Sequence, residues 1–120
     1  MNLKNAALAF MVGAISLFGA STSYVTEHET HCAETVKHAQ AAVAEGQNDN
    51  AKGVVEYAKQ ALTHAEMAEK LKSDPHITEV KTHLNQAIEH GDMGHAKVAG
   101  EHAQQGVDHL KMAYKEKKKP

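Results

Sequence analysis

The sequence predicts an all-α protein, an up-down-up-down four-helix bundle made of two duplicated helical hairpins. Residues that favour helix over sheet dominate: Ala, Glu, Lys, Gln and His are abundant, aromatic residues make up only 4 %, and there are two prolines. From about residue 26 onward, apolar residues recur with helical spacing in four runs. Shifted by 45 residues, the chain matches itself at 14 of the 40 positions 31–70. Two similar hairpins joined by short connections favour a four-helix bundle.

The first 23 residues have the order of a secretory signal. Lys4 precedes an uncharged apolar run of 15 residues at 6–20, and small residues follow it. The run is shorter than the roughly 18–20 residues that span a bilayer, although a retained membrane anchor is the alternative. We expect cleavage between Ala20 and Val25, at a position that the several small residues leave open. A histidine-rich domain at 24–120 would then reach the periplasm, without contact to the membrane.

The first hairpin consists of predicted helices at 27–45 and 51–72. Thr26 and Glu29 have the spacing of a capping box, which starts a helix. Gly46 is expected just past the end of the first helix, where glycine is common. The polar residues 47–50 form the turn before the second helix.

The second hairpin consists of predicted helices at 76–90 and 95–117. Asp74 is expected to cap the first of them, with Pro75 in its first turn. Gly91 is expected to end that helix, and residues 92–94 turn the chain into the last one.

The ten histidines, all at position 28 or later, dominate the pattern of the chain. Eight of them lie in series with seven-residue spacing: His31, His38, His76, His83, His90, His95, His102 and His109. The residues one, four and five positions after each histidine are mostly apolar or small, and these positions form the core. The histidines therefore flank the core, and His64 joins their column through the repeat.

Facing positions of an antiparallel hairpin have a constant sum of residue numbers. This rule predicts four histidine pairs: His31–His64, His76–His109, His83–His102 and His90–His95. The first hairpin continues with His38–Tyr57 and Glu45–Asn50, and so carries fewer ligands. Histidines seven residues apart on one helix are separated by about 10.5 Å, whereas metal–nitrogen bonds are about 2 Å, so a shared ion needs the facing helix.

Further ligands lie close to the histidines on the same helices. Glu34 lies between His31 and His38, and Glu79 occupies the equivalent place in the repeat, within reach of either neighbouring histidine. His28, His31 and Cys32 have spacings of three and four residues, which place imidazole beside thiol. The candidate metal ligands are His28, His31, Cys32, Glu34, His38, His64, His76, Glu79, His83, His90, His95, His102 and His109.

The sulfur-containing residues leave alternatives open. Met67 and Met112 follow His64 and His109 by three residues, and either pack in the core or offer thioether ligands. Together with Cys32 they would favour Cu(I). Cys32 is either a small buried residue or a ligand. A single cysteine excludes an intramolecular disulfide, so we expect a monomer, or a disulfide-linked dimer through Cys32.

Composition argues against several classes of function. The chain has a net charge of −2 and no arginine, which argues against nucleic-acid binding. It has no strong nucleophile–base motif, which argues against an enzyme. It also lacks a C-x-x-C-H motif and has few aromatic residues, which disfavours a haem-based electron-transfer bundle.

The chain resembles the small metal-binding protein family of the bacterial periplasm over roughly residues 27–112. The resemblance lies in the exported start, the heptad histidines and the units 36–39, 64–65, 87–91 and 101–103. It implies a four-helix bundle that binds several divalent metals, copper foremost, for sequestration or tolerance. The chain departs from that pattern where Glu45, Asn50 and Tyr57 stand in the histidine columns, and where Cys32 and the methionines add softer ligands.

These observations predict a non-enzymatic periplasmic protein that sequesters or buffers Cu(II), with Ni(II) and Zn(II) as weaker or competing ions. One alternative is a pH- or metal-responsive stress-sensing bundle that binds a partner and stores no metal. Another is a duplicated helical sequence whose histidines were copied without use.

Overall fold

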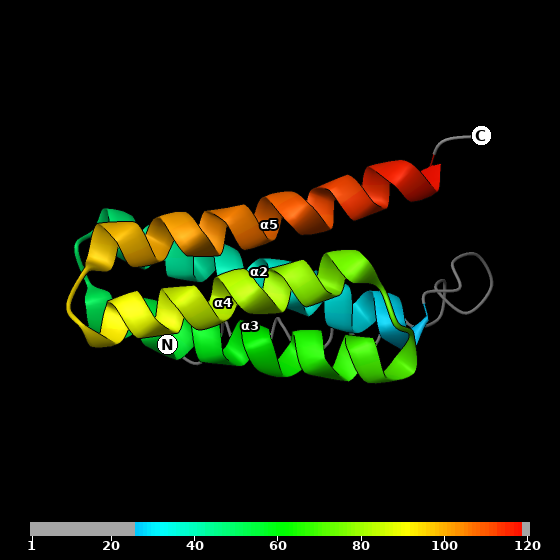
Figure 1. Cartoon of the computed structure of the whole chain (residues 1–120), viewed down its shortest axis with the longest axis horizontal. Helices are drawn as coiled ribbons and strands as arrows, with labels where there is room; N and C mark the ends of the chain where they lie inside the picture. Colours follow the sequence, from blue (N-terminus) through cyan, green and yellow to red (C-terminus); the bar gives the residue numbers. More distant parts are fainter. Residues whose placement is uncertain (1–25, 119–120) are drawn as a thin grey trace, which may run out of the picture.

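The computed structural model describes residues 26–118, with side chains described as far as residue 113. The predicted signal at 1–23 lies outside this part of the chain. The described residues form four helices, which confirms the all-α prediction (Figure 1). The helices are α2 (Glu27–Gln47), α3 (Ala51–Leu71), α4 (Pro75–Asp92) and α5 (Ala96–Lys118).

The helices pack as two antiparallel hairpins that close into a bundle. The main contacts join α2 to α3 and α4 to α5 within the hairpins, and α2 to α5 and α3 to α4 between them. Each helix therefore lies beside its neighbours in the sequence, and α5 returns beside α2 (Figure 1). The predicted up-down-up-down order is confirmed. Among the described helices, none combines the length and the apolar character needed to cross a bilayer.

Side chains at two helix starts satisfy backbone N–H groups as the sequence predicts. The Thr26 hydroxyl accepts a hydrogen bond from the Glu29 backbone N–H at 3.0 Å and donates one to the Glu29 carboxylate at 2.9 Å. The Asp74 carboxylate accepts from the His76 backbone N–H at 2.8 Å, and Pro75 begins α4. These caps fix where the first helix of each hairpin starts, and with it the phase of its histidine column.

The two glycines that were expected just past helix ends lie inside helices, so that prediction is wrong. Helix α2 continues through Gly46 to Gln47, and α4 continues through Gly91 to Asp92. The left-handed backbone conformations occur later, at Asp49 (φ 60°) and Gly94 (φ 83°). Gly46 has a packing role, because a Cβ atom there would lie 2.8 Å from the Cα atom of Gly100 on α5. Gly91 likewise makes room for the Val55 side chain of α3.

The core is built largely from small residues. Alanine and glycine fill most buried positions of α3 and α5 and half of those of α2, whereas larger buried side chains concentrate in the second hairpin, where they are Ile77, Val80, Leu84, Val107 and Leu110. Small side chains let helix axes approach closely. Residues that flank the core on the two helices of a hairpin come within reach of one another in both hairpins.

Two of the four seams between helices carry grooves that contain no histidine. Val43, Gly46 and Gly100 line the groove between α2 and α5. Val55 and Gly91 line the corresponding groove between α3 and α4. The heptad histidines occupy the other two seams, within the hairpins.

We predict opposite effects of alanine at two helical glycines. Gly46→Ala should lower the free energy of unfolding by about 1–2 kcal/mol, because overpacking against Gly100 outweighs the gain in helix propensity. Gly106→Ala is the matched control, since its Cβ atom would meet other atoms only at 3.8 Å; it should raise the free energy of unfolding by up to about 1 kcal/mol. Urea denaturation of the metal-free protein followed by circular dichroism measures both. Equal stabilisation by both changes would contradict the close approach of α2 and α5.

Candidate metal centre

The heptad histidines face one another along the seam inside each hairpin. All four expected pairs are in ring contact, with centroid distances of 5.3 Å for His31–His64, 6.2 Å for His76–His109, 6.2 Å for His83–His102 and 5.7 Å for His90–His95. In the first hairpin, the Asn50 amide also donates to the Glu45 carboxylate at 2.6 Å, across the turn. These contacts confirm the predicted register of both hairpins.

Diagonal contacts between successive levels were not predicted from the sequence. His38 contacts His64 at 5.4 Å in the first hairpin, and in the second His83 contacts His109 at 5.2 Å and His90 contacts His102 at 5.1 Å. Every Cα–Cβ bond of a helix tilts toward that helix's N-terminus. In an antiparallel pair, this tilt moves level side chains apart and brings one set of diagonal neighbours together. The tilt is a general property of helices, so it was an available signal.

Together the level and diagonal contacts form continuous columns of imidazoles. The second hairpin carries six rings in sequence: His76, His109, His83, His102, His90 and His95. The first hairpin carries three: His31, His64 and His38. Eight of the ten histidines are partly buried, so the columns lie at the edge of the core, as the heptad pattern predicts.

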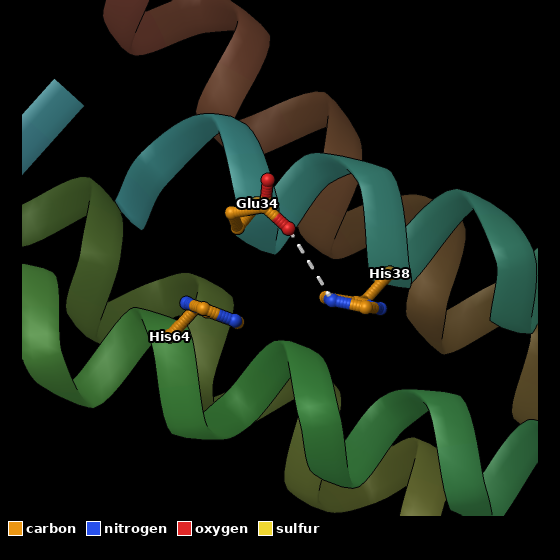
Figure 2. A group of neighbouring side chains, drawn as sticks. All are labelled: Glu34, His38 and His64. Atoms are coloured by element: carbon orange, nitrogen blue, oxygen red, sulfur yellow. Dashed lines mark ion pairs between the residues drawn. The ribbon is translucent and has the colours of Figure 1, made fainter. Parts of the chain in front are cut away.

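One three-donor group lies in the first hairpin. Glu34 and His38 come from α2 and His64 from α3, and one donor atom of each lies within 4.8 Å of the other two. The Glu34 Oε1 atom is 3.5 Å from His38 Nε2, and the His64 ring faces His38 from the other helix (Figure 2). A helix side chain extends over the preceding turn, which places His38 beside the glutamate four residues earlier.

The second hairpin repeats this group at the equivalent positions. Glu79, His83 and His109 are each 45 residues after Glu34, His38 and His64, and their donor atoms also lie within 4.8 Å of one another. Among the described residues these are the two groups with three such donors. In both groups the glutamate lies with the histidine four residues after it. The histidine three residues before it, His31 or His76, belongs to neither three-donor group. The sequence allowed the glutamate to lie with either.

Buried nitrogen atoms in the second hairpin test whether the site fits a metal ion. The Nδ1 atoms of His83, His102 and His109 are buried and make no hydrogen bond within the described part of the chain. A buried polar atom without a partner costs about 1–3 kcal/mol. Ligation by His83 and His109 would satisfy such atoms. Two imidazoles and one carboxylate also form a donor set that Cu(II), Ni(II) and Zn(II) accept. The residues present therefore fit a divalent transition-metal ion.

Each three-donor group contains one histidine whose pKa is lowered: His64 in the first hairpin and His83 in the second. Burial lowers the pKa of His64, and the neighbouring His38 and His31 lower it further, against the opposing effect of Glu34. Burial also lowers the pKa of His83, helped by His109 and His102 and opposed by a hydrogen bond with Gln86 and by Glu79. Lowered pKa values keep these imidazoles neutral, which is the form that binds metal.

The expected cluster of His28, His31 and Cys32 is divided in the structure. Cys32 and His28 are buried together, with 4 % and 8 % of their surface exposed, and the Cys32 Sγ atom lies 3.9 Å from both ring nitrogens of His28. His31 instead points across the hairpin, where its Nδ1 atom lies 3.1 Å from His64 Nδ1. Cys32 belongs to neither three-donor group.

The two methionines do not pack in the core, so that alternative is wrong. Met67 and Met112 are 41 % and 44 % exposed. Met67 lies two residues after the core residue Ala65, and Met112 two residues after Leu110. Two residues along a helix turn the side chain to the opposite side, so both methionines face away from the bundle interior. Their thioethers are accessible to solvent.

Comparison with known proteins agrees with this geometry. A family model described as small metal-binding protein matches residues 4–113. The chain belongs to this small metal-binding protein family. The match covers all of the described candidate ligands, and it confirms the family resemblance inferred from the heptad histidines. None of the curated proteins matches the chain.

We predict that the metal-free protein loses stability as the pH falls. The folded state lowers the pKa of His64 and His83 below their ordinary 6.5, so the unfolded chain binds more protons as the pH drops through that value. The urea midpoint should therefore fall between about pH 7.5 and about pH 5.5. The double variant His64→Gln/His83→Gln should show a smaller change. A midpoint that rises on acidification would contradict the assignment.

Proposed function

We propose that this member of the small metal-binding protein family binds divalent transition-metal ions, copper first, and sequesters or buffers them in the periplasm. The observation that carries the proposal is the recurrence of one glutamate and two histidines at equivalent positions of both hairpins. Each group takes ligands from both helices of its hairpin. Two such groups in one small bundle favour a protein that holds several ions.

The chemistry of the donors supports copper as the preferred ion. Imidazole suits copper, nickel and zinc, and affinity for sites of this kind generally rises toward Cu(II). Ni(II) and Zn(II) then compete more weakly. Cu(I) would be held by softer donors, for which Cys32 and the exposed thioethers of Met67 and Met112 are the candidates.

The position of the histidines supports binding and release over catalysis. The columns lie partly exposed along the hairpin seams, and the grooves of the other two seams contain none of these ligands. Partly exposed ligands let an ion exchange with its surroundings. A role as a periplasmic store further rests on the expected signal at 1–23, and a monomer suffices for it because each group lies within one chain.

We predict that His83 and His109 bind one shared copper ion. His83→Gln or His109→Gln alone should lower the affinity for that ion by at least about ten-fold. The double variant should lose little further affinity, because either single change already removes one of the shared ligands. The control pair is His83→Gln with His64→Gln, which lie in different hairpins and should give additive losses. Equilibrium dialysis against Cu(II) measures the unsubstituted protein, the three single variants and the two double variants.

Additive losses for His83 and His109, equal to those of the control pair, would contradict a shared ion. Absence of copper uptake by the unsubstituted protein would contradict the proposed function itself. Circular dichroism of each variant shows whether the helical fold is kept.

A further inference from the structure

The turn end of the second hairpin carries three histidines that the first hairpin lacks. They are His90 at the end of α4, His95 in the turn, and His102 on α5. Shifted by 45 residues, their equivalents are Glu45, Asn50 and Tyr57. The two hairpins thus share the glutamate–histidine groups and differ at this end.

Two of these histidines are already spaced as ligands of one ion. The Nδ1 atoms of His90 and His95 lie 3.4 Å apart. Two nitrogens bound to one ion at about 2.0–2.1 Å in tetrahedral geometry are separated by about 3.3–3.4 Å. This spacing matches a tetrahedral ion such as Zn²⁺ as it stands, and the square-planar geometry that Cu(II) prefers needs the two nitrogens about 0.5 Å closer, which side-chain rotation supplies.

His102 supplies a third nitrogen only after its side chain rotates, because these three histidines do not bring their donor atoms within 4.8 Å of one another in the structure. Its ring stacks on that of His90, with centroids 5.1 Å apart and planes inclined by 14°. It lies closer to His90 than to His83, whose centroid is 6.2 Å away. The buried Nδ1 atom of His102 makes no hydrogen bond to any described residue. Rotation of this side chain toward the His90–His95 pair would give that nitrogen a partner.

The equivalent place in the first hairpin is closed by a hydrogen bond. Asn50 Nδ2 donates to Glu45 Oε1 at 2.6 Å, and Asn50 Oδ1 accepts from the Gly53 backbone N–H at 3.1 Å. The asparagine therefore joins the two helix ends and caps α3, which is a structural role. The comparison shows that this end of a hairpin folds without histidines, so folding alone does not require them in the second hairpin.

We propose that His90, His95 and His102 form a third ion site, made of imidazole nitrogens alone and present only in the second hairpin. The proposal rests on the proposed function and names a further site for the same class of ligand, a divalent ion that accepts imidazole. The site differs from the two glutamate–histidine groups in having no carboxylate. Imidazole nitrogens bind borderline ions such as Cu(II) well. They bind Mg²⁺ and Ca²⁺ poorly, because these ions prefer oxygen ligands.

The test transfers the first hairpin's residues into the second. The triple variant His90→Glu/His95→Asn/His102→Tyr keeps residues that this bundle already accommodates at the equivalent positions. Equilibrium dialysis of the full-length protein against Cu(II) should find one ion fewer per chain than in the unsubstituted protein. Electron paramagnetic resonance of the copper-loaded proteins should show that the lost signal is the one with three nitrogen ligands.

A single substitution tests the same site in case the triple variant does not fold. His95 is exposed, so His95→Asn leaves the core unchanged. It should lower the affinity for one copper ion by at least about ten-fold. Glu79→Gln is the matched control. It should lower the affinity for a different copper ion and leave the resonance signal of copper with three nitrogen ligands in place.

Unchanged copper stoichiometry in the triple variant, with copper bound normally by the unsubstituted protein, would overturn the third site and leave the proposed function standing. Loss of the three-nitrogen signal in Glu79→Gln would also overturn it, because the imidazoles would then belong to the glutamate-containing site. Failure of the unsubstituted protein to bind copper would overturn the proposed function.

Discussion

The candidate metal sites depend on the antiparallel pairing of helices within each hairpin, which sets the histidine columns of the two helices face to face. Alanine and glycine fill most buried positions of α3 and α5 and half of those of α2, and Gly46 and Gly100 allow α2 and α5 to touch backbone to backbone. The second hairpin makes the same histidine contacts around larger buried side chains such as Leu84 and Val107, so the register of the two helices matters more than the size of the core residues.

The tilt of helical side chains then decides which histidines meet. Level pairs share a sum of residue numbers, but the tilt brings His83 to His109 and His38 to His64 across the diagonal. The same tilt carries His38 and His83 over the glutamates four residues earlier. One geometric property of the helix thus assembles the same group twice, because the sequence is duplicated.

Much of this arrangement follows from the sequence, and the exceptions have physical causes. Heptad spacing, the 45-residue repeat and the caps at Thr26 and Asp74 predict the helices, their order and their register. Glycine next to a polar turn predicts a helix end, yet Gly46 and Gly91 serve contacts with other helices, which one helix's sequence does not reveal. The exposure of Met67 and Met112 likewise depends on how far each core face extends. The diagonal histidine contacts required the tilt as well as the register.

The central claim is that in each hairpin a glutamate and two histidines, drawn from both helices, hold one shared ion. Crystals of the copper-loaded protein, measured at the copper absorption edge, test it most directly. The account predicts anomalous peaks within bonding distance of Glu34, His38 and His64, and of Glu79, His83 and His109. Copper found only at exposed carboxylates, or only beside Cys32 and the methionines, would contradict it.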